Sequence, residues 1–320
     1  MKKLDLAIVA SAALAALCIA PAASGQAYPT KPVELVVAFQ PGGGVDSMAR
    51  VFAEAARPLF PQPFVVVNKP GASGAIGLTY VASAPADGYK VAMIFAELLT
   101  IPLVGIGKVN SSEFEPIARL ASDPGTVTVR ADAPWNSVEE LIAHAKANPG
   151  KVTFSNAGNA SISHIAAAAL AQKTGTQFVH VPYQGSGPAV VGLVGGQVDA
   201  TAVNYAVVAP QVAAGKLKVL AVMSDKRLPA QDKAPTLRER GIDVTIDVWR
   251  GIAVAKDTAK DIVGTLRGLA AKVMQDPKLL EVLRTQNLTA AYQDGPDFAR
   301  ELARQGEWFK QTIPALDLKN

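Results

Sequence analysis

Short apolar runs alternate with helical patterns along most of the chain, and this alternation constrains the fold more than any other feature. The run at 33–39 is rich in β-branched residues and predicts a strand that is buried on both faces. The segment 46–59 then places apolar residues at helical spacing, with Asp46 at the position of an N-cap. Alternating strands and helices predict an α/β fold in which helices cover both faces of parallel sheets.

The same pattern continues through the middle of the chain. Further strands are expected at 64–67, 90–95, 127–129, 151–155, 178–182, 198–203 and 217–223, and helices at 74–84, 137–147, 161–173, 188–194 and 208–214. Ser137 and Glu140 predict a capping box at the start of one of these helices. Residues 244–255 are expected to be extended, and the chain beyond 258 to be mostly helical.

Polar, glycine-rich loops follow several of the predicted strands. Glycines 42–44 stand between the strand at 33–39 and the next helix, where unpaired backbone N–H groups and the helix dipole favour an anion. A tight turn that binds nothing explains this loop equally well. Three more loops, at 68–77, 155–164 and 183–188, have the same place between strand and helix. Together the four loops predict a cleft lined by helix N-termini, which suits a carboxylate.

The first 27 residues predict a secretory signal peptide, with cleavage after Ala27. A retained N-terminal anchor is the alternative. The only cysteine, Cys18, lies in this segment, so the mature chain is expected to have no disulfide and no thiolate chemistry. The formal net charge of +4 is small, and no basic tract carries interleaved aromatic residues, so nucleic acid is not an expected partner.

Residue sets typical of catalysis are scarce. The sequence contains no Gly-x-Ser-x-Gly, His-Glu-x-x-His or Walker-type motif, which predicts neither an enzyme nor a metal or cofactor site. His164, in the first turn of a predicted helix, either contacts a ligand or supports the loop that does. Glu97 follows the strand at 90–95 and is either an exposed loop carboxylate or a residue of the ligand site.

Seven motifs occur in an order that resembles one family closely. They are "YPTKPVELVVAFQPGGGVDSMAR", "NKPGASGAIG", "APADGYKV", "SNAGNASISHIA", "VPYQGSGPAVVGLVGGQVDA", "GKLKVLAVMSDKR" and "PTLRERG". Over residues 28–315 the chain resembles the solute-binding receptors of tripartite tricarboxylate transporters, also called Bug-type receptors.

The resemblance implies a periplasmic protein with a two-lobed, type II periplasmic-binding-protein fold (a "Venus flytrap"), each lobe built on a doubly wound sheet. Lobe 1 would comprise residues 28–127 and 251–320, and lobe 2 residues 128–250. A small organic anion would bind between the lobes, and a monomeric receptor would present it to the subunits of a membrane permease. A receptor for a membrane sensor, or a periplasmic enzyme on the same scaffold, are the alternatives.

The resemblance also implies which residues bind the ligand. In this family, backbone amides, short polar side chains and waters hold the carboxylates. Carried onto this sequence, the ligand-binding residues are Gln40, Gly43, Gly44 and Asp46 in lobe 1 and Ser155, Ala157, Gly158, Asn159, Ser161 and Ser163 in lobe 2, with Tyr183, Gly185 and Asn204 as further candidates.

Glu97 departs from the family pattern, which has a small Ser/Thr/Gly-rich loop after the third strand. An acidic residue in a carboxylate site repels the ligand unless the ligand also carries a cation. If Glu97 faces the cleft, we therefore expect it to select a ligand with an ammonium or amide group over a plain dicarboxylate.

Overall fold

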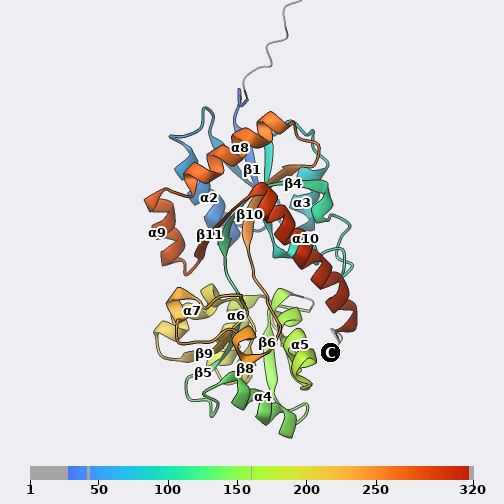
Figure 1. Ribbon diagram of the computed structural model, residues 1–320, viewed down its shortest axis with the longest axis vertical. Helices are drawn as coiled ribbons and strands as arrows, with labels where there is room; N and C mark the ends of the chain where they lie inside the picture. Colours follow the sequence, from blue (N-terminus) through green and yellow to red (C-terminus); the bar gives the residue numbers. More distant parts are fainter. Residues whose placement is uncertain (1–27, 42–43, 160, 317–320) are drawn as a thin grey trace, which may run out of the picture.

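The computed structural model describes residues 28–41, 44–159 and 161–316, and its strands form two sheets in two lobes (Figure 1). The predicted signal peptide, residues 1–27, lies outside the described residues, as does Gly43. Within the part of the chain that is described, no helix has the length and apolar character needed to cross a membrane.

The first lobe, at the top of Figure 1, is built on six strands. They are β1 (Val33–Val37), β2 (Phe64–Asn68), β3 (Lys90–Phe95), β4 (Phe114–Ser122), β10 (Arg250–Ala255) and β11 (Thr289–Asp294), in the order β11-β4-β10-β3-β1-β2. Its α-helices are α2 (Gly44–Ala56), α3 (Ala75–Ala82), α8 (Lys260–Val273), α9 (Pro277–Thr285) and α10 (Gly295–Thr312).

The second lobe, at the bottom of Figure 1, is built on five strands. They are β5 (Thr126–Arg130), β6 (Thr153–Asn156), β7 (Val179–Pro182), β8 (Ala200–Thr201) and β9 (Leu217–Val222), in the order β7-β6-β8-β5-β9. Its α-helices are α4 (Val138–Ala147), α5 (Ile162–Thr174), α6 (Ser186–Val194) and α7 (Tyr205–Ala213).

Both sheets repeat one topology. Three parallel strands (β2-β1-β3 and β7-β6-β8) are followed by a strand that enters from the other lobe, β10 or β5, and runs antiparallel to both its neighbours. This order confirms the predicted two-lobed α/β fold of type II connectivity. The expectation of wholly parallel sheets is wrong at β10 and β5, because these strands enter from the other lobe and so arrive from the opposite direction. It is also wrong at β11, which runs antiparallel to β4 at the edge of the first sheet.

Two strands were not predicted from the sequence. In β4, Glu115, Pro116 and Arg119 interrupt the apolar run, and the strand pairs with β10 through a register shift. β11 has no fully buried residue along Thr289–Asp294 and stands at the edge of the sheet, so the chain after 258 is not wholly helical as expected. The Ser137 hydroxyl caps α4 as predicted, but the Glu140 carboxylate accepts the N–H of Asn136 instead of closing the capping box.

The chain crosses between the sheets twice, at 122–126 and 246–250, and the two crossings are joined by hydrogen bonds. Gly125 N–H donates to the Ile246 carbonyl (2.9 Å) and Val248 N–H to the Asp123 carbonyl (3.2 Å). The lobe boundaries at 127/128 and 250/251 remain a prediction; β5 begins at Thr126.

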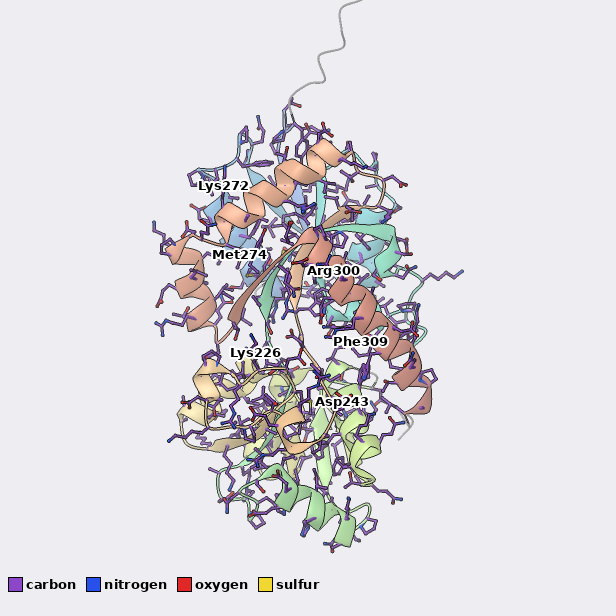
Figure 2. All side chains as sticks on the ribbon, viewed as in Figure 1. Lys226, Asp243, Lys272, Met274, Arg300 and Phe309 are labelled. Atoms are coloured by element: carbon purple, nitrogen blue, oxygen red, sulfur yellow. The ribbon has the colours of Figure 1, made fainter. Side chains whose placement is uncertain are left out.

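Helix α10 makes a third connection between the lobes. It starts on the first lobe and runs diagonally down toward α5 (Figure 1). In its second half, Gln305 accepts a hydrogen bond from the indole N–H of buried Trp249 in the second crossing (2.8 Å). Just beyond its end, the Ala315 carbonyl accepts a hydrogen bond from Gln172 of α5 (3.4 Å). Phe309 on α10 and Asp243 of the second lobe line one hollow (Figure 2).

Candidate ligand-binding cleft

A cavity of about 300 Å³ lies between the lobes and takes its walls from both. On the first lobe it is lined by Phe39, Ser73, Glu97, Thr100, Ile101, Val104 and Ile106, and on the second by Ala157, Gly158, Asn159 and Ser161. A smaller cavity of about 60 Å³ shares Glu97, Ala157 and Ser161 and extends toward the crossings. Its other lining residues are Gly125, Ile162, Ser163, Ser186, Ala202, Asn204, Ile246 and Val248.

The sheet topology explains why these residues meet. Phe39 follows β1, Glu97 follows β3, Ala157 follows β6 and Asn204 follows β8. The carboxyl ends of parallel strands share one edge of a sheet, and ligands bind in the crevice outside that edge. In this molecule the edges of both sheets face one cleft.

The N-terminus of α5 forms the polar wall of the cleft on the second lobe. The Ser161 hydroxyl caps the helix by accepting the N–H of His164 (3.3 Å), and the Ser163 hydroxyl accepts the N–H of Ala157 (2.9 Å). The two hydroxyl groups lie 3.1 Å apart. A helix N-terminus carries partial positive charge, so hydroxyl and amide donors here favour an anionic group.

The loop before α5 is held in shape by its own contacts. The Asn156 side-chain oxygen accepts the N–H of Gly158 (2.9 Å), and Gly158 has a φ of 122°, which L-residues with a side chain rarely adopt. Ser155 lies in β6, and its hydroxyl donates to the Ala189 carbonyl (3.1 Å). The structure therefore places Ser155 behind the cleft wall, where it joins β6 to α6.

Glu97 is the acidic group of the cleft. It lies in the first turn of a 3-10 helix, Ala96–Leu99, and lines both cavities. Burial raises the pKa of its carboxyl, while its own backbone N–H and the charge of Arg250 counteract part of that rise. Of the two interpretations of Glu97 left open by the sequence, the one that places it in the cleft fits the structure.

The glycine-rich loop of the first lobe contributes less than the sequence suggested. Asp46 lies inside the first turn of α2, so its prediction as an N-cap is wrong. Its carboxylate binds Arg50 (2.9 and 3.0 Å) and Asn68 (2.9 Å), and Asn68 also donates to the Phe39 carbonyl (3.0 Å). Asp46 thus holds the loop in place through Asn68. Gln40 is exposed and outside both cavity walls.

The remaining predicted residues lie around the cleft. Gly44 starts α2, and Gly185 precedes α6, with the Tyr183 hydroxyl bonded to Gln197 (3.0 Å). His164 is fully buried, with its ring 4.6 Å from that of His180. None of these residues lines either cavity within the described ranges.

Several lining residues were not predicted from the sequence. Ser73 and Ser186 follow strands, as the predicted ligand residues do, so their positions alone could have identified them. Thr100, Ile101, Val104 and Ile106 come from a stretch that carries no local polar signal. These residues line the cavity only because the folded chain brings this stretch against the cleft.

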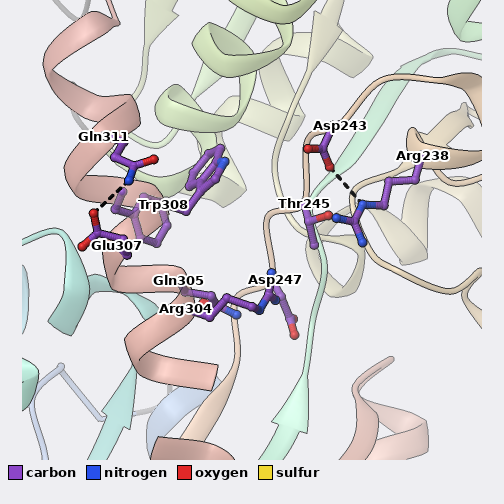
Figure 3. Close-up of a pocket in the computed structure, with 10 residues that line it drawn as sticks. Arg238, Asp243, Thr245, Asp247, Arg304, Gln305, Glu307, Trp308 and Gln311 are labelled. Atoms are coloured by element: carbon purple, nitrogen blue, oxygen red, sulfur yellow. Dashed lines mark hydrogen bonds and ion pairs between the residues drawn. The ribbon is translucent and has the colours of Figure 1, made fainter. Parts of the chain in front are cut away.

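A second hollow of about 390 Å³ separates α10 from the second lobe (Figure 3). Its charged side chains are bound to other protein groups. Arg238 pairs with Asp225 (2.6 Å) and Asp243 (3.0 Å), and Glu307 accepts a hydrogen bond from Gln311 (2.8 Å). Since these groups already satisfy one another, the hollow offers a ligand less than the cleft does.

Four charged residues form a hinge cluster at the crossings: the buried Arg119, Asp123 and Arg250, and the partly buried Asp247. Arg119 pairs with Asp247, and Arg250 lies 3.6 Å from the Asp123 carboxylate, which also accepts hydrogen bonds from Asn204 and from the N–H of Ala206 (2.9 Å).

Burial dominates the titration of both carboxyl groups in the hinge cluster. It raises the pKa of Asp123 to about 6 against the opposing effect of Arg250, and it raises the pKa of Asp247 against that of Arg119. Arg119 in β4 pairs with Asp247 in the second crossing, and Arg250 in β10 lies beside Asp123 in the first crossing. The cluster therefore links the two crossings. Among the described residues, no group of His, Cys, Asp and Glu side chains is arranged to hold a metal ion.

Comparison with known proteins identifies a family and several similar proteins. The family described as "Tripartite tricarboxylate transporter family receptor" matches residues 48–318. A Cupriavidus necator protein, "UPF0065 protein in gbd 5'region", is 33% identical over 312 residues, which cover 97% of this chain and 94% of that protein.

Two solved structures extend the comparison. The crystal structure of a TctC solute-binding protein from Polaromonas is 46% identical, with a TM-score of 0.84, and covers 90% of this chain and 100% of that one. A Rhodopseudomonas palustris protein with adipate is 27% identical, with a TM-score of 0.76, and covers 90% and 97% of the two chains.

Proposed function

Because the chain belongs to the tripartite tricarboxylate transporter receptor family, we propose that it captures a small organic anion between its lobes and delivers it to the permease of such a transporter. Receptors of this family are periplasmic solute-binding proteins, and the proteins similar to this chain are receptors rather than enzymes. The mature protein begins at Tyr28 and acts as a monomer in this proposal.

The observation that carries the proposal is the cavity between the lobes. Its second-lobe wall presents the N-terminus of α5 with the hydroxyl groups of Ser161 and Ser163, and its first-lobe wall is largely apolar. Such a wall can hold a carboxylate without a basic side chain, because oriented N–H and O–H donors supply the positive potential. The adipate in the R. palustris structure supports a carboxylate as the ligand class.

Closure of the lobes would couple binding to recognition by the membrane partner. A ligand that touches both walls binds the closed form better than the open form, and this difference in affinity shifts the population toward closure. The crossings at 122–126 and 246–250 are the segments about which such a rotation would occur. A membrane sensor would read the same closed form, so it remains the alternative partner.

A thermal-shift panel on residues 28–320 tests the binding step. The panel contains mono-, di- and tricarboxylates, amino acids and amides. A ligand at about a hundred times its dissociation constant stabilises the folded protein by about 2.7 kcal/mol and raises the Tm by several degrees. A panel in which no organic anion raises the Tm would contradict the proposal.

Uptake measurements test delivery. Cells that lack both the receptor and its permease should take up the labelled ligand only when both are restored. Uptake that does not depend on the receptor, together with a receptor-dependent change in transcription, would favour the sensor. Product formed from any ligand of the panel would favour an enzyme.

A further inference from the structure

Glu97 is the one ionisable side chain in the walls of the two cleft cavities, as far as the described residues go. The other lining side chains are hydroxyl, amide or apolar groups. Any ligand that fills the cleft therefore meets one carboxyl group, and no lysine or arginine lines the described walls beside it.

The position of Glu97 is well fixed. Leu98 and Leu99, which follow it in the 3-10 helix, are buried in the first-lobe core. The Thr100 hydroxyl and backbone N–H both donate to the Glu97 carbonyl (3.3 and 2.9 Å), which closes the turn. Within the described ranges no other side chain hydrogen-bonds to the Glu97 carboxylate, so beside the bond from its own backbone N–H it keeps acceptor capacity for a ligand.

The protonation of Glu97 depends on two neighbouring effects. Burial favours the neutral acid, whereas Arg250 at the start of β10 favours the carboxylate. The Nε and Nη1 atoms of Arg250 are buried with no hydrogen-bond partner among the described residues. A positive ligand group beside Glu97 would favour the ionised carboxylate further, in the same sense as Arg250.

The opposite wall has the opposite character. Ser161 lines both cavities together with Glu97, and it caps α5, whose N-terminus attracts negative charge. The cleft thus has an anion-binding end on the second lobe and an acidic group on the first. A dipolar ligand matches this arrangement, whereas a dicarboxylate would set one of its charges against Glu97.

Apart from Glu97, Ser73 and Thr100, the first-lobe wall of the larger cavity is apolar. Phe39, Ile101, Val104 and Ile106 line it on the first lobe. Burial of an apolar ligand group against these residues is favourable, while a charged group there would lose its hydration without gaining a partner. The third part of the ligand should therefore be a hydrocarbon group.

We propose that the ligand is an amino acid with an apolar side chain. Its carboxylate binds at the N-terminus of α5, its ammonium group binds Glu97, and its side chain packs on Ile101, Val104 and Ile106. This inference rests on the proposed receptor function and narrows the ligand class within it.

Calorimetric titration of the mature protein with matched ligands tests the inference. Leucine and 4-methylpentanoate share a carbon skeleton and differ in the ammonium group, as do valine and 3-methylbutanoate and phenylalanine and 3-phenylpropanoate, and adipate completes the set. We expect at least one of the amino acids to bind about tenfold or more tighter than its deaminated counterpart, because a hydrogen bond to a charged group is lost in the counterpart.

The Glu97→Gln variant should remove that preference and bring the two ligands to similar affinity. The Glu97→Asp variant keeps the charge and should keep the order of ligands with weaker binding. Glu54→Gln is the matched control, since Glu54 is an exposed first-lobe residue of α2 outside both cavities, and it should bind like the wild type. Circular dichroism confirms that each variant is folded.

Two outcomes overturn the inference and leave the receptor function standing. One is tight binding of adipate with no binding of any amino acid. The other is an unchanged order of ligands in Glu97→Gln. Failure of every organic anion, including those of the wider thermal-shift panel, would instead overturn the receptor function itself.

Discussion

The hinge cluster and the cleft lie side by side between the two sheets, and they differ in how their polar groups are satisfied. In the hinge cluster, Asp247 pairs with Arg119, and Asp123 has Arg250, Asn204 and the Ala206 N–H around it. In the cleft, Glu97 has no side-chain hydrogen bond from the described residues, and hydroxyl groups and a helix N-terminus face it.

This difference indicates that the hinge cluster serves stability and the cleft serves ligand binding. A buried charge is costly without a partner, so the pairs of the hinge cluster stabilise the arrangement of the crossings once both members are present. Polar groups in the cleft keep capacity for hydrogen bonds that only a ligand can use. Changes in the hinge cluster should therefore alter stability and leave ligand choice unchanged, and changes in the cleft should do the reverse.

The largest expected effect comes from Asp247→Ala. It would leave Arg119 buried without its carboxylate and remove the acceptor of the Ser122 hydroxyl. We expect the free energy of unfolding to fall by about 3–5 kcal/mol, measured by urea denaturation, with the order of ligands unchanged. In the matched control Asp243→Ala, which breaks an exposed pair with Arg238, the loss should be below about 1 kcal/mol. Equal losses in both variants would contradict the distinction.

The second effect is a pH dependence that originates at Asp123. Its pKa is raised to about 6 in the folded protein, so the folded state holds the proton more tightly than the unfolded state. Its contribution to stability is complete below the unfolded pKa of about 3.9 and is lost as pH rises to about 6, on the order of 3 kcal/mol in all. Burial raises the pKa of Asp247 and of Glu97 too, which adds a change of the same sign.

The variant Asp123→Asn isolates this contribution. Urea denaturation at several pH values between 4 and 7 should give a wild-type stability that falls more steeply with rising pH than that of the variant. Only the difference between the two curves counts, because paired carboxylates such as Asp294 have a lowered pKa and act with the opposite sign in both proteins. Parallel curves would show that Asp123 is not the origin.

The smallest of the three effects concerns the cleft. Ser161→Asp keeps an N-cap on α5, since aspartate caps helices as well as serine does, but it adds a negative charge where the ligand carboxylate would bind. Binding should weaken about a hundredfold or more at an unchanged Tm of the free protein. Ser137→Asp makes the same exchange at the N-cap of α4, and calorimetry should find its ligand affinity unchanged. Similar binding by Ser161→Asp and the wild type would place the ligand elsewhere.

The sequence predicted those parts of the molecule that depend on local patterns. β1 and β3 are apolar runs, and the loop at 155–164 was recognised by its polar residues between a strand and a helix. The resemblance to a family then identified Ala157, Gly158, Asn159 and Ser161 within it, and these four residues lie in the cavity walls. The order of the strands, by contrast, came from the resemblance to a family.

The parts that were missed depend on tertiary contacts. β4 is stable as a strand because it pairs with β10 and β11, and β11 because it pairs with β4, while the sequences of both strands are mixed in polarity. Asp46 has the residue type of an N-cap, yet Arg50 and Asn68 bind its carboxylate within the helix. The apolar wall at Ile101 and Val104 is indistinguishable from core in the sequence, because only the position of the second lobe turns it into a binding surface.

Helix α10 has a mechanical consequence. Its first half packs on the first lobe, where Phe298 lies buried against Gly251 of β10, and its end meets the second lobe at Gln172, away from the two crossings. A helix does not stretch, so it works as a strut of constant length across the joint. A rotation of the second lobe that moves α5 parallel to α10 can keep α5 in contact with Ala315. A rotation that moves α5 away from α10 must break the hydrogen bond between Gln172 and the Ala315 carbonyl. The strut therefore favours one direction of lobe rotation over the other.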